Sequence, residues 1–327
     1  ILLIRIDYNV SIRNKNIFQE DCSIMKYKVL SLKAMDPIGH KMMEDADCEV
    51  ITAPDGSKTE DFIKLIKDNQ VDAIYCRVDK VTKEMIDASK NLKVISKQGV
   101  GLDNIDMKYA SSKKIPVGWA PGGNATSVAE HTILMMMMCA VRYRYVDSEM
   151  RKGNFNVRYT LKGTWELTGQ TLGLLGCGRI GQIVAKIASQ GFGMKVIGYD
   201  PFPPKAPLVP IEMMSQDEVL KQADFVSLHM PSMPSTVHSI NYDKFCMMKP
   251  SAFFINCARG DVIVEDDLVR ALQEKKIAGA GIDVFEKEPL PLNDPLVTLD
   301  NVVLTPHTSA TTIQSVRKCT TMACQCI

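Results

Sequence analysis

The sequence predicts an α/β protein with two domains, each built around a parallel β-sheet. Its 327 residues are enough for about two domains of ordinary size. From Tyr27 onward, short apolar runs alternate with polar stretches of helical period, which is typical of strands joined by crossover helices. A loop-forming cluster at residues 121–124 separates two such series, and we therefore place a domain boundary there.

The composition is that of a globular protein whose basic and acidic side chains are nearly balanced, so it has no large net charge that would attract a charged partner. Hydrophobic residues make up 46% and charged residues 24% of the chain, with 39 basic against 38 acidic side chains. This balance favours neither nucleic acid nor an anionic membrane. The apolar run 133–141 is far shorter than the ~20 residues that span a bilayer. We therefore expect no nucleic-acid partner and no membrane association.

The cysteines predict the redox environment. There are ten, scattered along the chain, and no CxxC pair has a matching second pair. A zinc site is therefore not expected, and we predict no metal. Most of these residues should be reduced thiols, as in a cytoplasmic protein.

The first series predicts a sheet of five parallel strands. The expected strands are residues 27–32, 49–53, 72–77, 93–97 and 116–119, with helical segments at 61–69 and 83–89. Residues 1–24 resemble neither a strand–helix unit nor a linker. We expect an N-terminal extension of unknown role there, and Met25, which directly follows it, fits a natural start.

The second series predicts a doubly wound sheet of six strands. A long apolar helix precedes it, with Ser127 and Glu130 at the spacing of a capping box, and is expected to run to about Ser148. Its methionine-rich face is either core or a subunit contact, and His131 on this helix is expected to be packed rather than catalytic. The expected strands are residues 171–175, 195–199, 225–230, 252–256, 279–284 and 301–305.

A glycine-rich loop follows the first strand of the second series and leads directly into a helix. Gly176 permits a tight turn, Gly178 lets the backbone approach a pyrophosphate, and Gly181 lets the helix pack against the strand. The helix N-terminus offers free N–H groups to the phosphates, and Arg179 adds a charge-assisted contact. Asp200 ends the next strand, where a carboxylate accepts from ribose hydroxyls and repels a 2′-phosphate. The unit predicts a dinucleotide cofactor, NAD rather than NADP.

Three polar residues, Arg259, Glu288 and His307, lie at or just beyond later strand ends, where open α/β sheets bind their ligands. A histidine can move the proton that hydride transfer between NAD and an alcohol carbon requires, and a nearby carboxylate stabilises its charged form. An arginine fork grips a substrate carboxylate and polarises its carbonyl. Each residue alone fits a structural role. Together they suffice to oxidise a 2-hydroxy acid or to reduce a 2-oxo acid.

Seven short motifs, in order along the chain, resemble those of the D-isomer-specific 2-hydroxyacid dehydrogenases. The resemblance covers residues 27–313, nearly all of the chain after its first part. The motifs are GVGLDNID at 99–106, VAEH at 128–131, GCGRIG at 176–181, HMP at 229–231, NCARG at 256–260, DVF with EP within 283–289, and TPH at 305–307.

The resemblance implies a fold and a set of site residues. A Rossmann-type doubly wound NAD-binding domain, residues 124–305, would be inserted into a smaller flavodoxin-like substrate domain, residues 25–123 and 306–327. Arg259, Glu288 and His307 would be catalytic. The implied substrate-binding residues are Arg77, Val100 and Gly101. The implied cofactor-binding residues are Gly176, Gly178, Arg179, Ile180, Gly181, Asp200, His229, Met230, Pro231, Cys257, Ala258 and Asp283.

Within that family, the chain is most similar to phosphoglycerate dehydrogenases and hydroxypyruvate or glyoxylate reductases. This implies a small 2-hydroxy or 2-oxo acid as substrate, 3-phosphoglycerate or hydroxypyruvate/glyoxylate, and a homodimer. Arg77 would face a phosphate-bearing substrate, or it is a solvated charge at a strand end. Two alternatives stay open: an NAD-sensing, corepressor-like protein on the same fold, and an inactive fragment, because the chain ends soon after His307.

Overall fold

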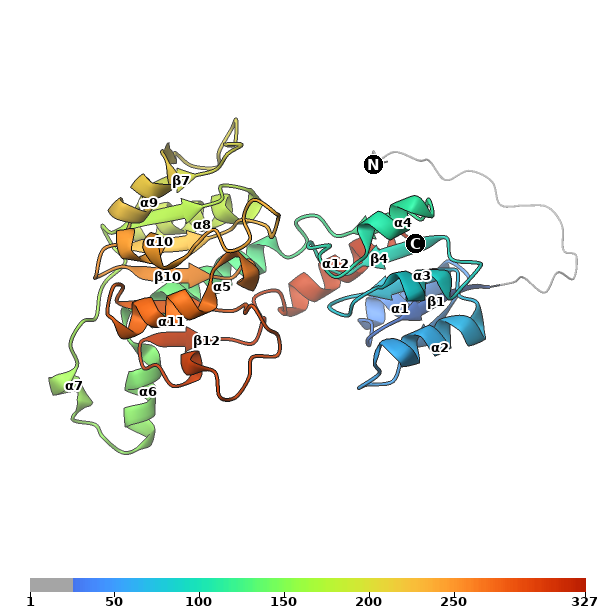
Figure 1. Cartoon of the computed structure of the whole chain (residues 1–327), viewed down its shortest axis with the longest axis horizontal. Helices are drawn as coiled ribbons and strands as arrows, with labels where there is room; N and C mark the ends of the chain where they lie inside the picture. Colours follow the sequence, from blue (N-terminus) through green and yellow to red (C-terminus); the bar gives the residue numbers. More distant parts are fainter. Residues whose placement is uncertain (1–25) are drawn as a thin grey trace, which may run out of the picture. The chain divides into compact units, whose positions relative to one another are not determined.

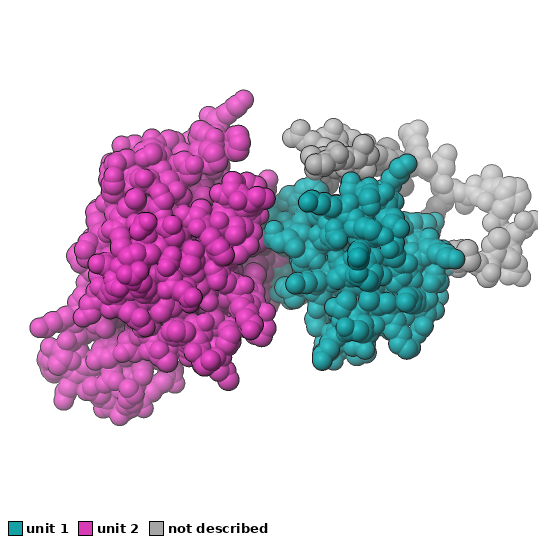
Figure 2. Space-filling view, viewed as in Figure 1, with its two compact units in different colours: residues 1–123, 316–327 teal, residues 124–315 magenta. Residues whose placement is uncertain are grey.

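The computed structural model describes residues 26–327, which form two compact units (Figure 2). Within the described residues, unit 1 holds the chain up to Gly123 together with Val316–Ile327, and unit 2 holds Asn124–Ser315. The expected return to the first domain is at residue 306, whereas in the structure the chain rejoins unit 1 at Val316. The expected extension at residues 1–24 lies outside the described residues.

Unit 1 is a five-stranded parallel sheet in the order β2-β1-β3-β4-β5, the flavodoxin-like order that was expected (Figure 1). Each of the five predicted strands is present, to within two residues at either end. The strands are β1 (Tyr27–Ser31), β2 (Cys48–Thr52), β3 (Ala73–Cys76), β4 (Val94–Lys97) and β5 (Val117–Trp119). The helices are α1 (Pro37–Asp45), α2 (Thr59–Asn69), α3 (Lys83–Asp87), α4 (Met107–Ser112) and α12 (Ile313–Cys324), which enters from unit 2.

Alternate residues of the strands in unit 1 pack into two separate apolar cores, one on each face of the sheet. In β3, Ile74 and Cys76 pack with the core beneath α2 and α3, whereas Ala73 and Tyr75 pack on the opposite face with α1 and α12. Helix α12 is tied to the sheet by polar contacts as well. The Ser96 hydroxyl donates to the Ala323 carbonyl at 2.7 Å. The C-terminal helix is therefore an integral layer of unit 1.

Unit 2 is a seven-stranded parallel sheet in the order β12-β11-β10-β9-β6-β7-β8, wound outward in both directions from β6. The strands are β6 (Thr171–Leu175), β7 (Lys195–Tyr199), β8 (Glu212–Met213), β9 (Phe225–Leu228), β10 (Phe253–Asn256), β11 (Gly279–Ile282) and β12 (Val302–Leu304). The helices are α5 (Ala125–Ala140), α6 (Tyr143–Arg151), α7 (Val157–Thr160), α8 (Arg179–Phe192), α9 (Gln216–Gln222), α10 (Tyr242–Met247) and α11 (Glu265–Gln273). The prediction of six strands missed β8, because a strand of only two residues is too short to show an alternating pattern in the sequence.

Each face of this sheet has its own apolar core. Phe253 and Ile255 of β10 point to the core beneath α5 and α8. Phe254, between them, points to the core beneath α9, α10 and α11, where its ring meets that of Phe245 edge-on at 5.2 Å. With helices on both faces, the loops at the strand ends are the part of the sheet left open to a ligand.

The connector helix differs from its prediction in two ways. It begins at Ala125 after Asn124, so the predicted capping box was wrong, and Ser127 lies inside the helix with its hydroxyl donating to the Ser309 carbonyl. It also ends at Ala140, because Arg142 takes a left-handed backbone conformation (φ 53°) that separates α5 from α6. The predicted single helix to Ser148 is therefore two helices. Figure 1 shows α6 and α7 as an arm that extends away from the sheet of unit 2.

The methionines of α5 are divided between core and surface. Met135 and Met136 are fully buried, whereas Met137 is 43% exposed. Among residues 26–327, no helix combines the length and the apolar character that a membrane crossing requires.

The core of unit 2 predicts a clear difference between two phenylalanines. Phe254→Ala removes a fully buried ring and should lower the free energy of unfolding by about 3–5 kcal/mol. Phe202 is 85% exposed, so Phe202→Ala should change it by less than about 0.5 kcal/mol. Urea denaturation followed by circular dichroism measures both. Equal losses in the two variants would contradict the core assignment.

Candidate functional site

The glycine loop lies where the sheet of unit 2 changes its winding direction, between β6 and β9. Gly176 has a φ of 102°, and a Cβ there would lie 2.7 Å from the carbonyl carbon and oxygen of His229. The His229 amide donates to the Leu175 carbonyl at 2.7 Å, which holds the two loops together. Only glycine meets both demands, the left-handed backbone and the close approach.

The next two glycines fit the approach of a pyrophosphate. A Cβ on Gly181 would lie 2.4 Å from the Gly176 carbonyl oxygen, so this glycine lets α8 pack against the turn. A Cβ on Gly178 would meet nothing within 4 Å, and its backbone is one that any residue can adopt. The space over Gly178 is thus a cradle that a side chain would fill, at the N-terminus of a 14-residue helix. Arg179 is exposed there and Ile180 is half-buried.

Asp200 lies beside this loop, as its position after β7 predicts. One of its carboxylate oxygens accepts from the Cys177 amide and the other from the Phe202 amide, both at 2.8 Å. These bonds fix the carboxylate next to the glycine loop. A carboxylate oxygen can accept more than one hydrogen bond, so the arrangement is compatible with ribose binding.

The loop after β9 carries His229, Met230 and Pro231. Burial lowers the pKa of His229 to about 4, so the ring is neutral at neutral pH, and its Nε2 atom lies 2.9 Å from the Ser227 hydroxyl. Met230 is buried and Pro231 is exposed. These residues form a wall beside the glycine loop.

Arg259, Glu288 and His307 follow three neighbouring strands, β10, β11 and β12, at the same edge of the sheet. His307 Nδ1 lies 2.8 Å from Glu288 Oε2, and the Phe285 amide donates to the other carboxylate oxygen at 3.2 Å. The side chains of the pair are 42% and 38% exposed. The structure thus joins the histidine and the carboxylate that the sequence analysis selected separately.

The charges around Glu288 keep it ionised. Its partial burial favours the neutral acid, but this effect is outweighed by the hydrogen bond and charge of His307, the Phe285 amide and the charge of Arg259. The pKa of Glu288 is therefore below its usual value. A carboxylate can only accept a hydrogen bond, so the Nδ1 atom of His307 carries the proton that is donated to Glu288. The other ring nitrogen, Nε2, is not part of this contact.

Arg259 is held by the close contact of two strand-end loops. A Cβ on Gly260 would lie 2.0 Å from the carbonyl carbon and oxygen of Phe285, so the loop after β10 rests directly on the loop that leads to Glu288. Arg259 Nη1 donates to the Ala258 carbonyl at 2.7 Å. Asn256 binds the Arg259 carbonyl at 2.9 Å and completes the turn.

Asp283 is completely buried, and its carboxylate binds the turn that carries His307. One oxygen accepts from the Thr305 hydroxyl at 2.6 Å and from the Thr308 amide at 2.9 Å. The other accepts from the Ser309 amide at 3.0 Å. The resemblance implies a cofactor contact for Asp283, which stays a prediction, and no pattern in the sequence indicates these bonds.

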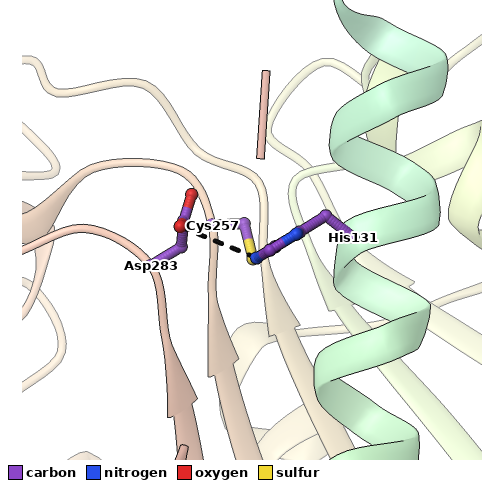
Figure 3. A group of neighbouring side chains, drawn as sticks. All are labelled: His131, Cys257 and Asp283. Atoms are coloured by element: carbon purple, nitrogen blue, oxygen red, sulfur yellow. Dashed lines mark ion pairs between the residues drawn. The ribbon is translucent and has the colours of Figure 1, made fainter. Parts of the chain in front are cut away.

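His131, Cys257 and Asp283 form a compact group (Figure 3), with ligand atoms all within 4.8 Å of one another. His131 comes from α5, and the other two come from loops after β10 and β11. Burial raises the pKa of the Cys257 thiol well above its usual value, although a metal would need the thiolate. The Asp283 oxygens already have donors. His131 and Asp283 are thus bonded to the turn at residues 305–309, an arrangement that does not favour a metal centre.

In unit 1, the predicted substrate-binding residues lie at the carboxyl ends of β3 and β4. Arg77 is half-buried, Val100 is 38% exposed, and Gly101 follows it. Lys97, which is 7% exposed, donates to the Arg77 carbonyl and, at 2.8 Å, to the Asn104 side chain. This buried lysine ties the two predicted substrate loops together.

Comparison with known proteins identifies the family. Residues 133–309 match the model of the NAD binding domain of the D-isomer specific 2-hydroxyacid dehydrogenases. The chain is 42% identical over 289 residues to D-3-phosphoglycerate dehydrogenase of Methanocaldococcus jannaschii, covering 87% of this chain and 54% of that protein. It is 43% identical over 263 residues to hydroxypyruvate reductase of Thermotoga maritima, covering 79% of this chain and 84% of that protein. The chain belongs to the D-isomer specific 2-hydroxyacid dehydrogenase family.

The solved structures agree with this assignment. A glyoxylate reductase from Paecilomyes thermophila is similar with a TM-score of 0.81 and 28% identity, covering 92% of this chain and 94% of that chain. The chain spans about half the length of the phosphoglycerate dehydrogenases that it matches. The names of these relatives do not favour the sensing alternative.

The cradle over Gly178 predicts a defect in cofactor binding without a defect in folding. Gly178→Val should leave the stability unchanged but weaken NADH binding on the order of tenfold, because the side chain fills the space over the helix N-terminus. Gly191→Ala, at another open position of α8, is the control and should bind NADH normally. Fluorescence titration measures both affinities, and an unchanged affinity in Gly178→Val would contradict the assignment.

Proposed function

We propose that this protein is an NAD-dependent D-2-hydroxyacid dehydrogenase, which transfers a hydride between NAD(H) and a small 2-hydroxy or 2-oxo acid. The observation that carries the proposal is the 2.8 Å contact between His307 and Glu288, beside Arg259 at the open edge of the sheet. A proton carrier, its carboxylate and an arginine fork are what this reaction requires beyond the cofactor.

The residues divide the reaction between them. When bound, the nicotinamide cofactor supplies or accepts the hydride. His307 moves the alcohol proton at Nε2, and Glu288, bonded at Nδ1, stabilises the imidazolium that forms on oxidation of the alcohol. Arg259 binds the substrate carboxylate and polarises the carbonyl that is reduced.

NAD is the proposed cofactor because of Asp200. Its carboxylate is fixed beside the glycine loop by two backbone amides, where it would accept from the ribose hydroxyls. A 2′-phosphate at the same place would meet a negative charge. For the rest of the cofactor, we propose the other cofactor-binding residues that the resemblance implies. They lie in the glycine loop and in the loops after β9, β10 and β11.

For the substrate, we propose 3-phosphoglycerate or hydroxypyruvate/glyoxylate. The relatives named above are dehydrogenases and reductases for these acids. In unit 1, Arg77 offers a charge for a phosphate, and the amides of Val100 and Gly101 offer donors for a carboxylate.

A panel of 2-oxo acids tests the proposal. Hydroxypyruvate, glyoxylate, pyruvate and 3-phosphohydroxypyruvate are each supplied with NADH or with NADPH, and absorbance of the reduced cofactor is followed. Reduction of at least one of the proposed acids should be faster with NADH. Turnover of none of the four would refute the proposed activity, and a preference for NADPH would refute the role of Asp200.

The pKa of Glu288 predicts a specific change in the pH profile. The carboxylate is ionised at neutral pH, so Glu288→Gln removes a charge that stabilises protonated His307. Reduction needs the protonated ring, so the alkaline limb of the profile should move to lower pH.

The control for this variant is Glu286→Gln. Glu286 lies two residues away in the same loop, but its carboxylate pairs with His238 at 2.9 Å rather than with His307. This control should keep the normal alkaline limb. An unshifted limb in Glu288→Gln would show that the carboxylate does not act on the histidine.

We further propose that the protein is a homodimer joined through the arm of unit 2. Helix α6 has no buried residue, although apolar side chains cover the arm and the neighbouring part of α5. A group of exposed apolar side chains of this kind is typical of an interface. The exposed residues are Leu134, Met137, Val141, Tyr143, Met150, Phe155, Tyr159 and Trp165.

The dimer has a direct test. Phe155→Asp combined with Tyr159→Asp places charges on side chains that are 59% and 70% exposed. We expect this variant to be a monomer by light scattering and the wild type a dimer. Phe202→Asp, at an exposed position elsewhere in unit 2, should remain a dimer. A monomeric wild type would refute the proposal.

The proposed location is the cytoplasm. Several cysteines of the described residues are buried thiols: Cys48, Cys76, Cys139, Cys177, Cys257 and Cys324. Reduced thiols of this kind are typical of cytosolic proteins.

A further inference from the structure

We infer that His131 is a positioning residue, which fixes the turn 305–309 and thereby the orientation of His307. The inference rests on the proposed function, in which His307 moves the proton. His131 Nε2 lies 3.0 Å from the Thr305 hydroxyl and 3.6 Å from the Asp283 carboxylate. It is therefore bonded to the turn rather than to the catalytic pair, and it acts through other residues.

The turn needs support because of its backbone. His307 has a φ of 54°, in the left-handed region that costs most residues free energy. Its amide donates to the main-chain carbonyl of Asp283 at 2.8 Å, and the amides of Thr308 and Ser309 donate to the carboxylate of the same residue. One buried aspartate thus holds three successive amides of the turn.

The hydrogen-bond inventory assigns the role of His131. The Thr305 hydroxyl has one proton, and it is donated to the carboxylate of Asp283, which can only accept. The remaining contact of that hydroxyl oxygen is with His131 Nε2, so Nε2 carries a proton and donates it. His131 thereby keeps the Thr305 hydroxyl aimed at Asp283, and its N–H dipole faces the buried negative charge.

A second contact comes from the same face of α5. Ser127 lies one helical turn before His131, and its hydroxyl donates to the Ser309 carbonyl. The two residues bind opposite ends of the turn, Thr305 and Ser309. Other positions of α5, such as Ile133, are apolar and packed in the core. The contacts of Ser127 and His131 with the turn explain why these two polar residues lie on this face of the helix.

The first experiment compares three variants in the reduction of the best 2-oxo acid with NADH. His131→Leu removes the donor, and we expect kcat to fall about tenfold or more with unchanged NADH affinity, because the catalytic ring is misplaced. His131→Gln offers an amide N–H near the position of Nε2 and should restore much of the rate. Ile133→Ala, a core variant two residues away, should lose stability but keep its kcat.

The second experiment needs no turnover. Hydrogen exchange of the peptide that covers residues 303–310 should be about tenfold faster in His131→Leu, restored in His131→Gln and unchanged in Ile133→Ala. Unchanged exchange in His131→Leu would overturn the inference, even if the variant loses activity. If the wild type turns over none of the acids, the proposed function fails, but the exchange result still decides whether His131 holds the turn.

Zinc titration provides a further decisive result. The inference predicts no stoichiometric Zn²⁺ binding by the cluster of His131, Cys257 and Asp283, because the polar atoms of His131 and Asp283 are engaged with the turn and burial disfavours the Cys257 thiolate. Tight binding of one Zn²⁺ that His131→Leu abolishes would assign the cluster to a metal and overturn the hydrogen-bond account.

Discussion

The structure of unit 2 depends on the close approach of strand-end loops at one edge of a parallel sheet. Because all its strands run in the same direction, the loops after β6, β9, β10, β11 and β12 meet there. Two glycines make this possible: a Cβ on Gly176 would collide with His229, and one on Gly260 with Phe285. Backbone packed this tightly fixes the turns that carry the side chains of this edge. The cradle over Gly178 and the pair of Glu288 and His307 are both products of this edge.

The same crowding determines which groups are charged. Glu288 stays ionised because a histidine, an amide and an arginine surround it, and His229 stays neutral because it is buried without a carboxylate partner among its described hydrogen bonds. Asp283 is buried, but several N–H and O–H donors offset the cost of burial. At this edge, exposed His307 is therefore paired with the ionised carboxylate of Glu288 and carried by a turn that buried Asp283 holds.

Much of this could be predicted from sequence because the signals are local. Buried parallel strands are short apolar runs, and the glycine loop has a strand before it and a helix after it, so both were located to within a few residues. The break at Arg142 could not be predicted, since neither glycine nor proline marks that left-handed residue. Ser127 and Glu130 have the spacing of a capping box, but the Ser127 hydroxyl binds Ser309, far along the chain. The strand β8 is too short to leave a pattern.

Some roles in the site could not be predicted from the sequence because they depend on contacts between residues far apart in the chain. The anchoring role of Asp283 depends on amides of residues 308 and 309, and that of Lys97 on the carbonyl of Arg77, which only the fold brings near. His131 appeared in a short motif, but no spacing rule connects it with Thr305.

The most direct test of the account is His307→Ala, examined for both NADH binding and turnover. If His307 is the proton carrier and the glycine loop binds the cofactor independently, kcat should fall by at least about 10²-fold while NADH affinity stays at the wild-type value. A variant that keeps its turnover, or that loses NADH binding in proportion to its activity, would contradict the account.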